Sequence, residues 1–142
     1  MFRISRILPE GSVFPYDFGF VPGTCAEDGD PIDVTVLGLA PSFPGCLVTA
    51  RLLGVLRARQ LERRRHIRND RMIAVAETEV NQSELVGLHS IGRTQLRAIE
   101  HFFVSYNRFQ GRDFRVTGRG GARMADALVT AAIRQFNKTS TK

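Results

Sequence analysis

The sequence predicts an α+β protein: a small β-barrel with two helices of the C-terminal half packed outside it. Two observations predict this class. The first two thirds of the 142 residues contain short apolar or β-branched segments separated by turns rich in Gly and Pro. In the last third, apolar residues recur at spacings of three and four. With 43% hydrophobic residues at this length, we expect a single domain over residues 1–142.

The strand segments come first along the chain. Residues 2–7 alternate in polarity, which places Arg6 on the face of Phe2 and Ile4. The apolar segment 46–56 contains Gly54, where a bend or bulge is expected. Residues 57–68 form a basic hairpin arm. The remaining β segments are an aromatic stretch over 14–22 and strands over 32–37, 72–76 and 112–117.

Two helices are predicted after these strands. Residues 94–108 have apolar side chains at helical spacing, ending with Tyr106. Residues 122–136 are rich in Ala, and a stripe of four residues is expected to face the core. The stripe consists of Met124, Leu128, Ala132 and Phe136.

The charges are unevenly distributed. The net charge is +6, and 18 of the 20 basic residues are Arg, whereas four acids gather within residues 27–33. Such a cluster on a basic protein suits a metal ion with an anionic ligand, and it equally suits a solvated acidic turn. The stretch 32–50 is low in charge but is broken by Gly and Pro, so no transmembrane helix is expected. Two cysteines and no secretory signal make the cytoplasm the expected location.

The most informative segment is Asp28-Gly29-Asp30-Pro31-Ile32-Asp33, which precedes a predicted buried strand. Three carboxylates on a bent loop can converge on one Mg²⁺ ion, which prefers oxygen ligands. An EF-hand is excluded, because its fifth, sixth and twelfth positions would be Ile32, Asp33 and Leu39. The alternative is a turn rich in Asp without a metal.

Several motifs together resemble the soluble family I inorganic pyrophosphatases. They are residues 14–24, the D-x-D-P-x-D core at 28–33, Asn69 to Val75 and Ile99 to Phe103. The resemblance implies an OB-like antiparallel β-barrel flanked by helices, Mg²⁺ dependence and hydrolysis of pyrophosphate to two phosphates. It also implies a homo-oligomer, commonly a hexamer in bacteria or a lower state. From the residues themselves, no membrane is expected as a partner, and a nucleic acid is a less favoured partner than a small phosphate ligand.

The resemblance implies roles for seven residues. Asp28 and Asp33 match metal ligands, and Asp30 matches the acid that orients or deprotonates the attacking water, as well as contacting metal. Asp70 is the candidate for a further metal ligand. Three other residues are expected to bind phosphate, and they are Arg6, Arg71 and Tyr106. From the residues alone, Arg6 also suits a surface position on an edge strand instead of a phosphate site. Tyr106 also suits a core position on a helix face.

Several positions depart from the family pattern. Asn69, Gln60, Phe18 and Asn107 each stand where the family has a charged group or a hydrogen-bond donor. The family also has an N-terminal segment that supplies lysine and glutamate to the site, and this chain begins after it. We therefore expect fewer bound metals and reduced activity.

Two alternatives remain open. The first is a catalytically weak or inactive relative that binds phosphate or nucleic acid through Arg. The second concerns residues 63–68, which contain four arginines, one histidine and Ile67. This segment has no Phe, Tyr or Trp on which a base could stack. For this segment the sequence favours a solvated hairpin arm over a nucleic-acid surface.

Overall fold

The computed structural model describes residues 16–38, 45–77 and 85–140. The elements follow the order β1 (Asp17–Phe20), β2 (Asp33–Leu37), β3 (Ala50–Glu62), β4 (Arg65–Arg68), β5 (Arg71–Ala76), a 3₁₀ turn η1 (Leu88–Ser90), α1 (Arg93–Phe109), β6 (Asp113–Gly121) and α2 (Ala122–Ser140). The predicted α+β class is confirmed. The strand predicted over 2–7, with Arg6, lies outside the described residues.

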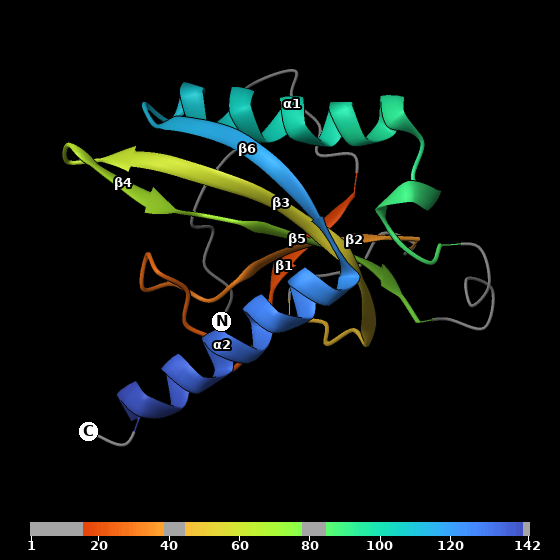
Figure 1. The fold of residues 1–142 in the computed structure, drawn as a ribbon, viewed down its shortest axis with the longest axis horizontal. Helices are drawn as coiled ribbons and strands as arrows, with labels where there is room; N and C mark the ends of the chain where they lie inside the picture. The colour runs from red at the N-terminus through yellow and green to blue at the C-terminus, as the bar shows by residue number, and fades with distance from the viewer. Residues whose placement is uncertain (1–15, 39–44, 78–84, 141–142) are drawn as a thin grey trace.

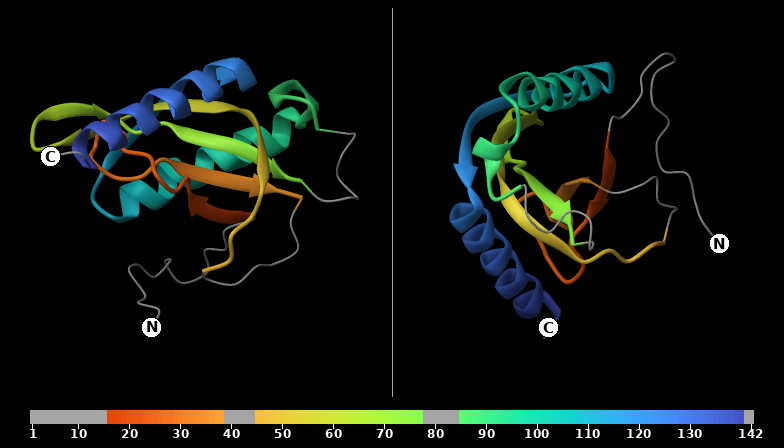
Figure 2. Two further views of the ribbon diagram at one scale, coloured as in Figure 1. Left: turned by 90° about the horizontal axis from the view of Figure 1, so that it is seen from below. Right: turned by 90° about the vertical axis from the view of Figure 1, so that its right-hand side faces the viewer.

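The six strands form one strongly curved sheet in the order β1-β2-β5-β3-β4, and β6 pairs with β3 (Figures 1 and 2). All ladders are antiparallel except β2–β5, which is parallel. The sheet therefore departs from the expected OB-like antiparallel arrangement at this one ladder. The chain returns to β2 only after the β3–β4 hairpin, so β5 runs in the same direction as β2. Within the described ranges, the sheet does not close into a complete barrel.

The long strand β3 is the centre of the sheet, because it pairs with β4, β5 and β6. Its register against β5 shifts between Leu52 and Gly54, as the sequence predicted from the glycine. A Cβ atom on Gly54 would lie 2.5 Å from the carbonyl oxygen of Gly120. Glycine is therefore required where β6 crosses close to β3.

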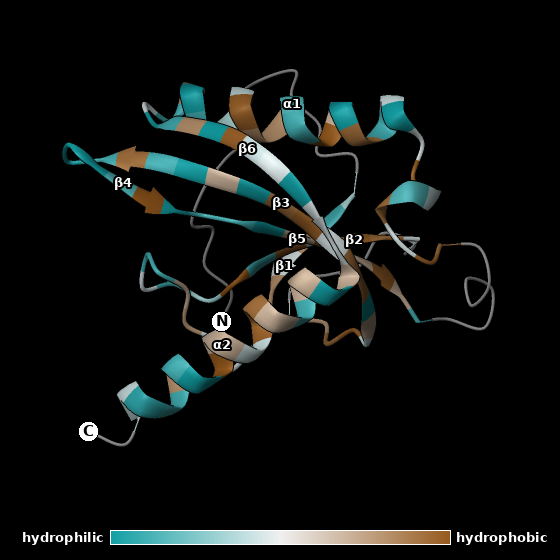
Figure 3. Ribbon diagram, in the orientation of Figure 1, coloured by the Kyte–Doolittle hydropathy of each residue, from teal (hydrophilic) through white to brown (hydrophobic). Residues whose placement is uncertain are grey.

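The helices cover the two faces of the curved sheet, and both are amphipathic (Figures 1 and 3). α1 packs on β6, and α2 packs on β3 and β6. One buried cluster lies beneath α1 and includes Leu56, Ile73 and Phe103. A smaller cluster lies beneath α2 and includes Val55 and Met72. Neighbouring residues of β3 and β5 thus point to opposite faces of the sheet and pack in different clusters.

The predicted apolar stripe of α2 is only partly right. Ala132 is buried and Leu128 is partly buried, whereas Met124 and Phe136 are exposed. Ala125 is buried in place of Met124. The small Ala side chains let the helix approach β3 closely, so the bulkier residues of the predicted stripe lie at the edge of the contact.

Neither α1 nor α2 is apolar enough over its length to cross a bilayer, and this holds for the whole described part of the chain, which leaves out 39–44, 78–84 and the two ends.

Candidate active site

The acidic loop before β2 is held by its own backbone. Buried Thr24 donates its hydroxyl to the carbonyl oxygen of Val21 at 2.6 Å and accepts from the amide of Ile32 at 3.0 Å. Gly29 has φ +88°, a left-handed conformation that glycine adopts at little cost. These contacts join the two ends of the loop, so the aspartates between them occupy a defined turn.

Asp28 and Asp30 lie together in this turn. The amide of Asp30 donates to Oδ1 of Asp28 at 3.0 Å, while the Asp30 side chain is exposed. Burial raises the pKa of the Asp28 carboxyl above its usual value, and the negative charge of Asp30 adds to the rise. The amide of Asp30 and the more distant Arg71 oppose it. The Asp28 carboxylate is thus only partly compensated by the protein.

Asp33, at the start of β2, is paired with Arg71 at the start of β5. Oδ2 of Asp33 contacts Nη1 of Arg71 as an ion pair. Arg71 is buried, and its guanidinium lies 5.2 Å from the ring centre of Phe103 and 5.4 Å from that of Phe114. The parallel register Val34↔Met72 brings these two strand starts side by side. The rings of Phe103 and Phe114 and the carboxylate of Asp33 therefore stabilise the buried guanidinium of Arg71.

A neutral amide pair is formed by Asn69, two residues before Arg71 along the chain, and Gln60 on β3. Nδ2 of Asn69 donates to Oε1 of Gln60 at 2.8 Å, and both side chains are buried. Asn69 and Gln60 are the two positions at which the sequence departs from the expected carboxylates. Because the two amides satisfy each other, they need no cation between them.

The structure does not bring Asp70 to the other predicted metal ligands. Its carboxylate accepts from the amide of Ala58 at 2.9 Å and contacts Arg57 and Arg68 at 3.3 Å each. It lines a hollow of about 470 Å³ beneath α2, together with Met72, whereas Arg71 points toward α1. Successive residues of an extended chain point to opposite faces, which separates Asp70 from Arg71.

Tyr106 is half-buried on α1, where its ring stacks on Phe102 at a centroid distance of 5.8 Å. The buried residue at the end of this helix is its neighbour Asn107, whose role as an internal hydrogen-bond partner the sequence reasoning missed. Nδ2 of Asn107 donates to the backbone carbonyl of Phe103 at 2.8 Å. The backbone carbonyl of Asn107 accepts from the amide of Arg112 at 2.9 Å. An Asn near a helix end followed by Gly111 was the available signal.

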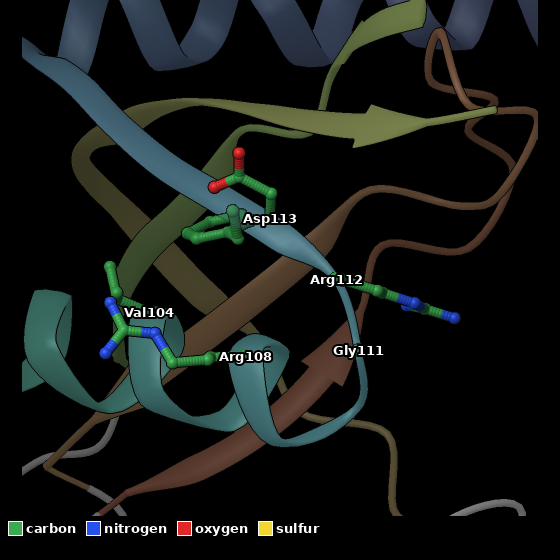
Figure 4. A pocket seen from close by; sticks show the side chains of 6 residues that line it. Val104, Arg108, Gly111, Arg112 and Asp113 are labelled. Carbon is green, nitrogen blue, oxygen red and sulfur yellow. The ribbon is translucent and has the colours of Figure 1, made fainter. Parts of the chain in front are cut away.

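A second hollow, of about 330 Å³, lies between the end of α1 and the start of β6 (Figure 4). Arg108 and Asp113 line it, while the Arg112 side chain extends away from them. Asp113 is already paired with Arg115 at 3.2 Å. Phe114 lines this hollow and also lies against Arg71, so the hollow adjoins the ion pair from the α1 side.

The predicted metal centre is only partly assembled. Across the described ranges, no three His, Cys, Asp or Glu side chains gather closely enough to form a metal cluster. Asp33 is neutralised by Arg71, and Asp70 faces the other way. The turn with Asp28 and Asp30 nevertheless fits a hard divalent cation, because it carries two carboxylates two residues apart, and the charge of Asp30 adds to the effect of burial in raising the pKa of Asp28.

Comparisons with known proteins show the family to which this chain belongs. The family model described as "Inorganic pyrophosphatase" matches residues 1–137. Inorganic pyrophosphatase of Nostoc sp. is 31% identical over 95% of this chain and 78% of its own, and that of Methanosarcina acetivorans is 32% identical over 96% and 79%. The crystal structure of inorganic pyrophosphatase from Thermus thermophilus superposes with a TM-score of 0.85 at 29% identity, covering 95% of this chain and 77% of that one. The chain belongs to the inorganic pyrophosphatase family.

Proposed function

We propose that this chain hydrolyses inorganic pyrophosphate to two phosphates and uses Mg²⁺ as its divalent metal. The observation that supports this most directly is the turn of Asp28 and Asp30 that leads into β2, where partly exposed Asp33 pairs with buried Arg71. Members of this family generally use a divalent metal. A bound Mg²⁺ supplies a water of lowered pKa and positive charge for phosphate oxygens.

In this proposal, Asp28 and Asp30 hold the metal, and Asp33 joins them when its carboxylate exchanges Arg71 for the cation. Asp30 is exposed at the tip of the turn, so its carboxylate can accept a proton from a water on the substrate side. Arg71 offers a planar donor to a phosphate oxygen. Arg6 and Tyr106 are proposed as further phosphate donors. Asp70 is left out, because its carboxylate is already bound to Arg57 and Arg68.

The alternative is a weakly active or inactive relative that binds phosphate through arginine. Two observations support it. Asn69 and Gln60 form a neutral buried amide pair where the family pattern has carboxylates, and Arg71 already neutralises Asp33. Both features reduce the number of cations that the site attracts. A cation-poor site stabilises a highly charged substrate less, so reduced activity belongs to the proposal.

A cytoplasmic location and a homo-oligomeric state, a hexamer or fewer copies, are part of the same proposal. The cysteines Cys25 and Cys46 are both free, which suits a reducing compartment. Large apolar side chains are exposed at Phe20 and Phe109, which suits contact with a second copy.

The deciding experiment measures phosphate release from pyrophosphate by the full chain, with and without Mg²⁺, at matched ionic strength. Phosphate release that requires Mg²⁺ and that is lost in Asp30→Asn supports the enzyme. Pyrophosphate binding without any release supports the alternative. A chain that neither binds nor cleaves pyrophosphate overturns both.

A further inference from the structure

Three arginines lie side by side across the outer face of the sheet. Arg59 on β3 is the register partner of Arg68 on β4 and of Arg115 on β6. Neighbouring strands are about 4.8 Å apart, so the three Cα atoms lie within about 10 Å of one another. Like charges directly opposite each other destabilise a sheet, so a row of this kind is unfavourable unless an anion lies on it.

The acids of this face only partly neutralise the row. Asp70 is shared by Arg57 and Arg68, and Asp113 pairs with Arg115. Arg59 is exposed, and none of the ion pairs in the described part of the chain includes it. The same is true of the arginines in the β3–β4 turn. The face therefore keeps an excess of positive charge at its centre and at its tip.

The β3–β4 turn has an unusual backbone for its side chains. Arg63 and Arg64 have φ of +49° and +65°, the left-handed conformation in which a residue with a Cβ atom is crowded. Two-residue hairpin turns of this kind strongly prefer Asn-Gly. The chain instead places arginines here, followed by a third at position 65. Adjacent arginines in an unfavourable turn point to a use for the cations at the tip.

The shape of the hairpin indicates the form of the anion. The turn projects beyond the neighbouring ends of α1 and β6, and its tip is hydrophilic (Figures 1, 2 and 3). A two-stranded β-ribbon fits the major groove of B-DNA, whereas the major groove of an RNA helix is too narrow for side chains to read. Residues 57–68 contain no Phe, Tyr or Trp, so bases of a single strand would find no stacking surface there.

We propose that the β3–β4 hairpin and the arginine row, defined by Arg59, Arg63, Arg64, Arg68 and Arg115, bind the phosphate backbone of duplex DNA without sequence preference. The sequence alone favoured a solvated arm for residues 63–68. The register row and the left-handed turn arginines are the observations that change this interpretation. The site contains no residue of the aspartate turn, although Arg68 shares the hollow beneath α2 with Glu27, and it does not depend on the proposed hydrolysis.

The test titrates the full chain into a short fluorescein-labelled DNA duplex over a series of salt concentrations and follows anisotropy. The main variant is Arg63→Asn/Arg64→Gly, which installs the preferred turn residues and should fold at least as stably as the parent. We expect its affinity at low salt to fall by about tenfold or more, with the salt slope reduced by about two. Its rate of pyrophosphate hydrolysis should be unchanged.

Two further variants complete the design. Arg59→Gln/Arg115→Gln removes two arginines of the row and should also weaken binding. Arg93→Gln/Arg97→Gln removes the same charge from exposed positions of α1 and should leave the affinity nearly unchanged. An equal loss in the α1 variant would overturn the proposal, because net charge alone would explain the binding. Tighter binding of single-stranded DNA or inorganic polyphosphate than of the duplex would also overturn it, as would an absence of salt-dependent binding.

Discussion

Arg71 and Asp33 form an ion pair across the parallel ladder of β2 and β5. The pair places a permanent cation where the aspartate loop enters the sheet. Arginine stays protonated at every relevant pH, so this cation cannot leave as a proton. Any divalent metal that uses Asp33 must compete with Arg71 for the same carboxylate. The behaviour of the site on metal binding should therefore depend on this one arginine.

Arg71→Met should destabilise the protein and strengthen its metal binding. Removing one partner of a buried pair leaves the other charge uncompensated, and we expect a loss of about 3 kcal/mol in the free energy of unfolding, at the lower end for buried pairs because Asp33 is partly exposed. Urea unfolding measures this loss. With Asp33 released, calorimetric titration should show tighter Mg²⁺ binding. Arg71→Lys keeps the charge and is the control, and equal Mg²⁺ affinity in all three proteins would contradict the competition.

Asp30→Asn should retain the fold and lose activity. The Asp30 side chain is exposed, and the hydrogen bond that Asp30 makes to Asp28 within the turn uses its backbone amide. Loss of an acid–base group of this kind lowers turnover by about 10²-fold or more. Glu27→Gln is a matched control, because Glu27 is an exposed acid of the same loop. Steady-state phosphate release compares the two, and equal rates would remove Asp30 from the reaction.

The raised pKa of Asp28 predicts a dependence of stability on pH in the metal-free protein. An acid whose pKa is higher in the folded state binds its proton more tightly there, so it destabilises the fold as pH rises through that pKa. Asp28→Asn removes this contribution and keeps a side-chain oxygen for the amide of Asp30. The variant should therefore have a higher melting temperature than the parent at pH 7.

The difference should disappear well below the ordinary Asp pKa of about 3.9, where both the folded and the unfolded chain are protonated. Thermal unfolding at several pH values with a chelator present makes the measurement. Asp126→Asn on the exposed face of α2 is the control. Added Mg²⁺ should raise the melting temperature of the parent more than that of Asp28→Asn. A lower melting temperature of metal-free Asp28→Asn at pH 7 would contradict the assignment.

Asn69→Asp should make stability depend on metal. The new carboxylate cannot donate to Oε1 of Gln60, so Gln60 must rotate its amide to donate instead, and a charge is added at a buried position. Without metal, we expect the melting temperature to fall. Mg²⁺ should restore more stability to this variant than to the parent, whereas NaCl at equal ionic strength should not. Identical Mg²⁺ responses in the two proteins would show that position 69 is remote from the cation.

Gly54→Ala tests the crossing of β3 and β6. The added methyl group would press on the carbonyl of Gly120 and the side chain of Leu88, and overpacking of this kind costs about 1–3 kcal/mol. Gly118→Ala on β6 is the matched control, because a methyl group added there would have nothing within 4 Å of it. Chemical unfolding should separate the two variants clearly. Equal stability would show that the strands move apart at little cost.

Local patterns predicted most elements of this fold, and the departures have physical causes. The glycine inside β3 predicted its register shift, and the apolar spacing predicted α1. The stripe of α2 was displaced, because a helix selects its contact face by how closely it can approach the sheet. Sequence order also could not show that β2 and β5 run parallel, since strand direction depends on the intervening connections.

The candidate site was predictable where its residues are consecutive. The turn containing Asp28 and Asp30 was identified from the sequence, whereas the closing of Arg71 onto Asp33 depends on contacts between distant segments. The direction of the Asp70 side chain, toward Arg57 and Arg68, could not be predicted in the same way. A one-residue step along an extended chain turns a side chain to the other face, and no composition argument resolves that step.

The parallel ladder of β2 and β5 also has a kinetic consequence. The β3–β4 hairpin joins neighbouring residues, and such hairpins form within about 1–10 μs. The β2–β5 ladder instead joins residues as far apart in sequence as Val34 and Met72. The entropy cost of closing this long loop must be met before the strand contacts can form. During synthesis or refolding, the β3–β4 hairpin should therefore form before Asp33 pairs with Arg71. Early in folding, this chain is a cationic hairpin attached to an unassembled site, exposed to any polyanion nearby.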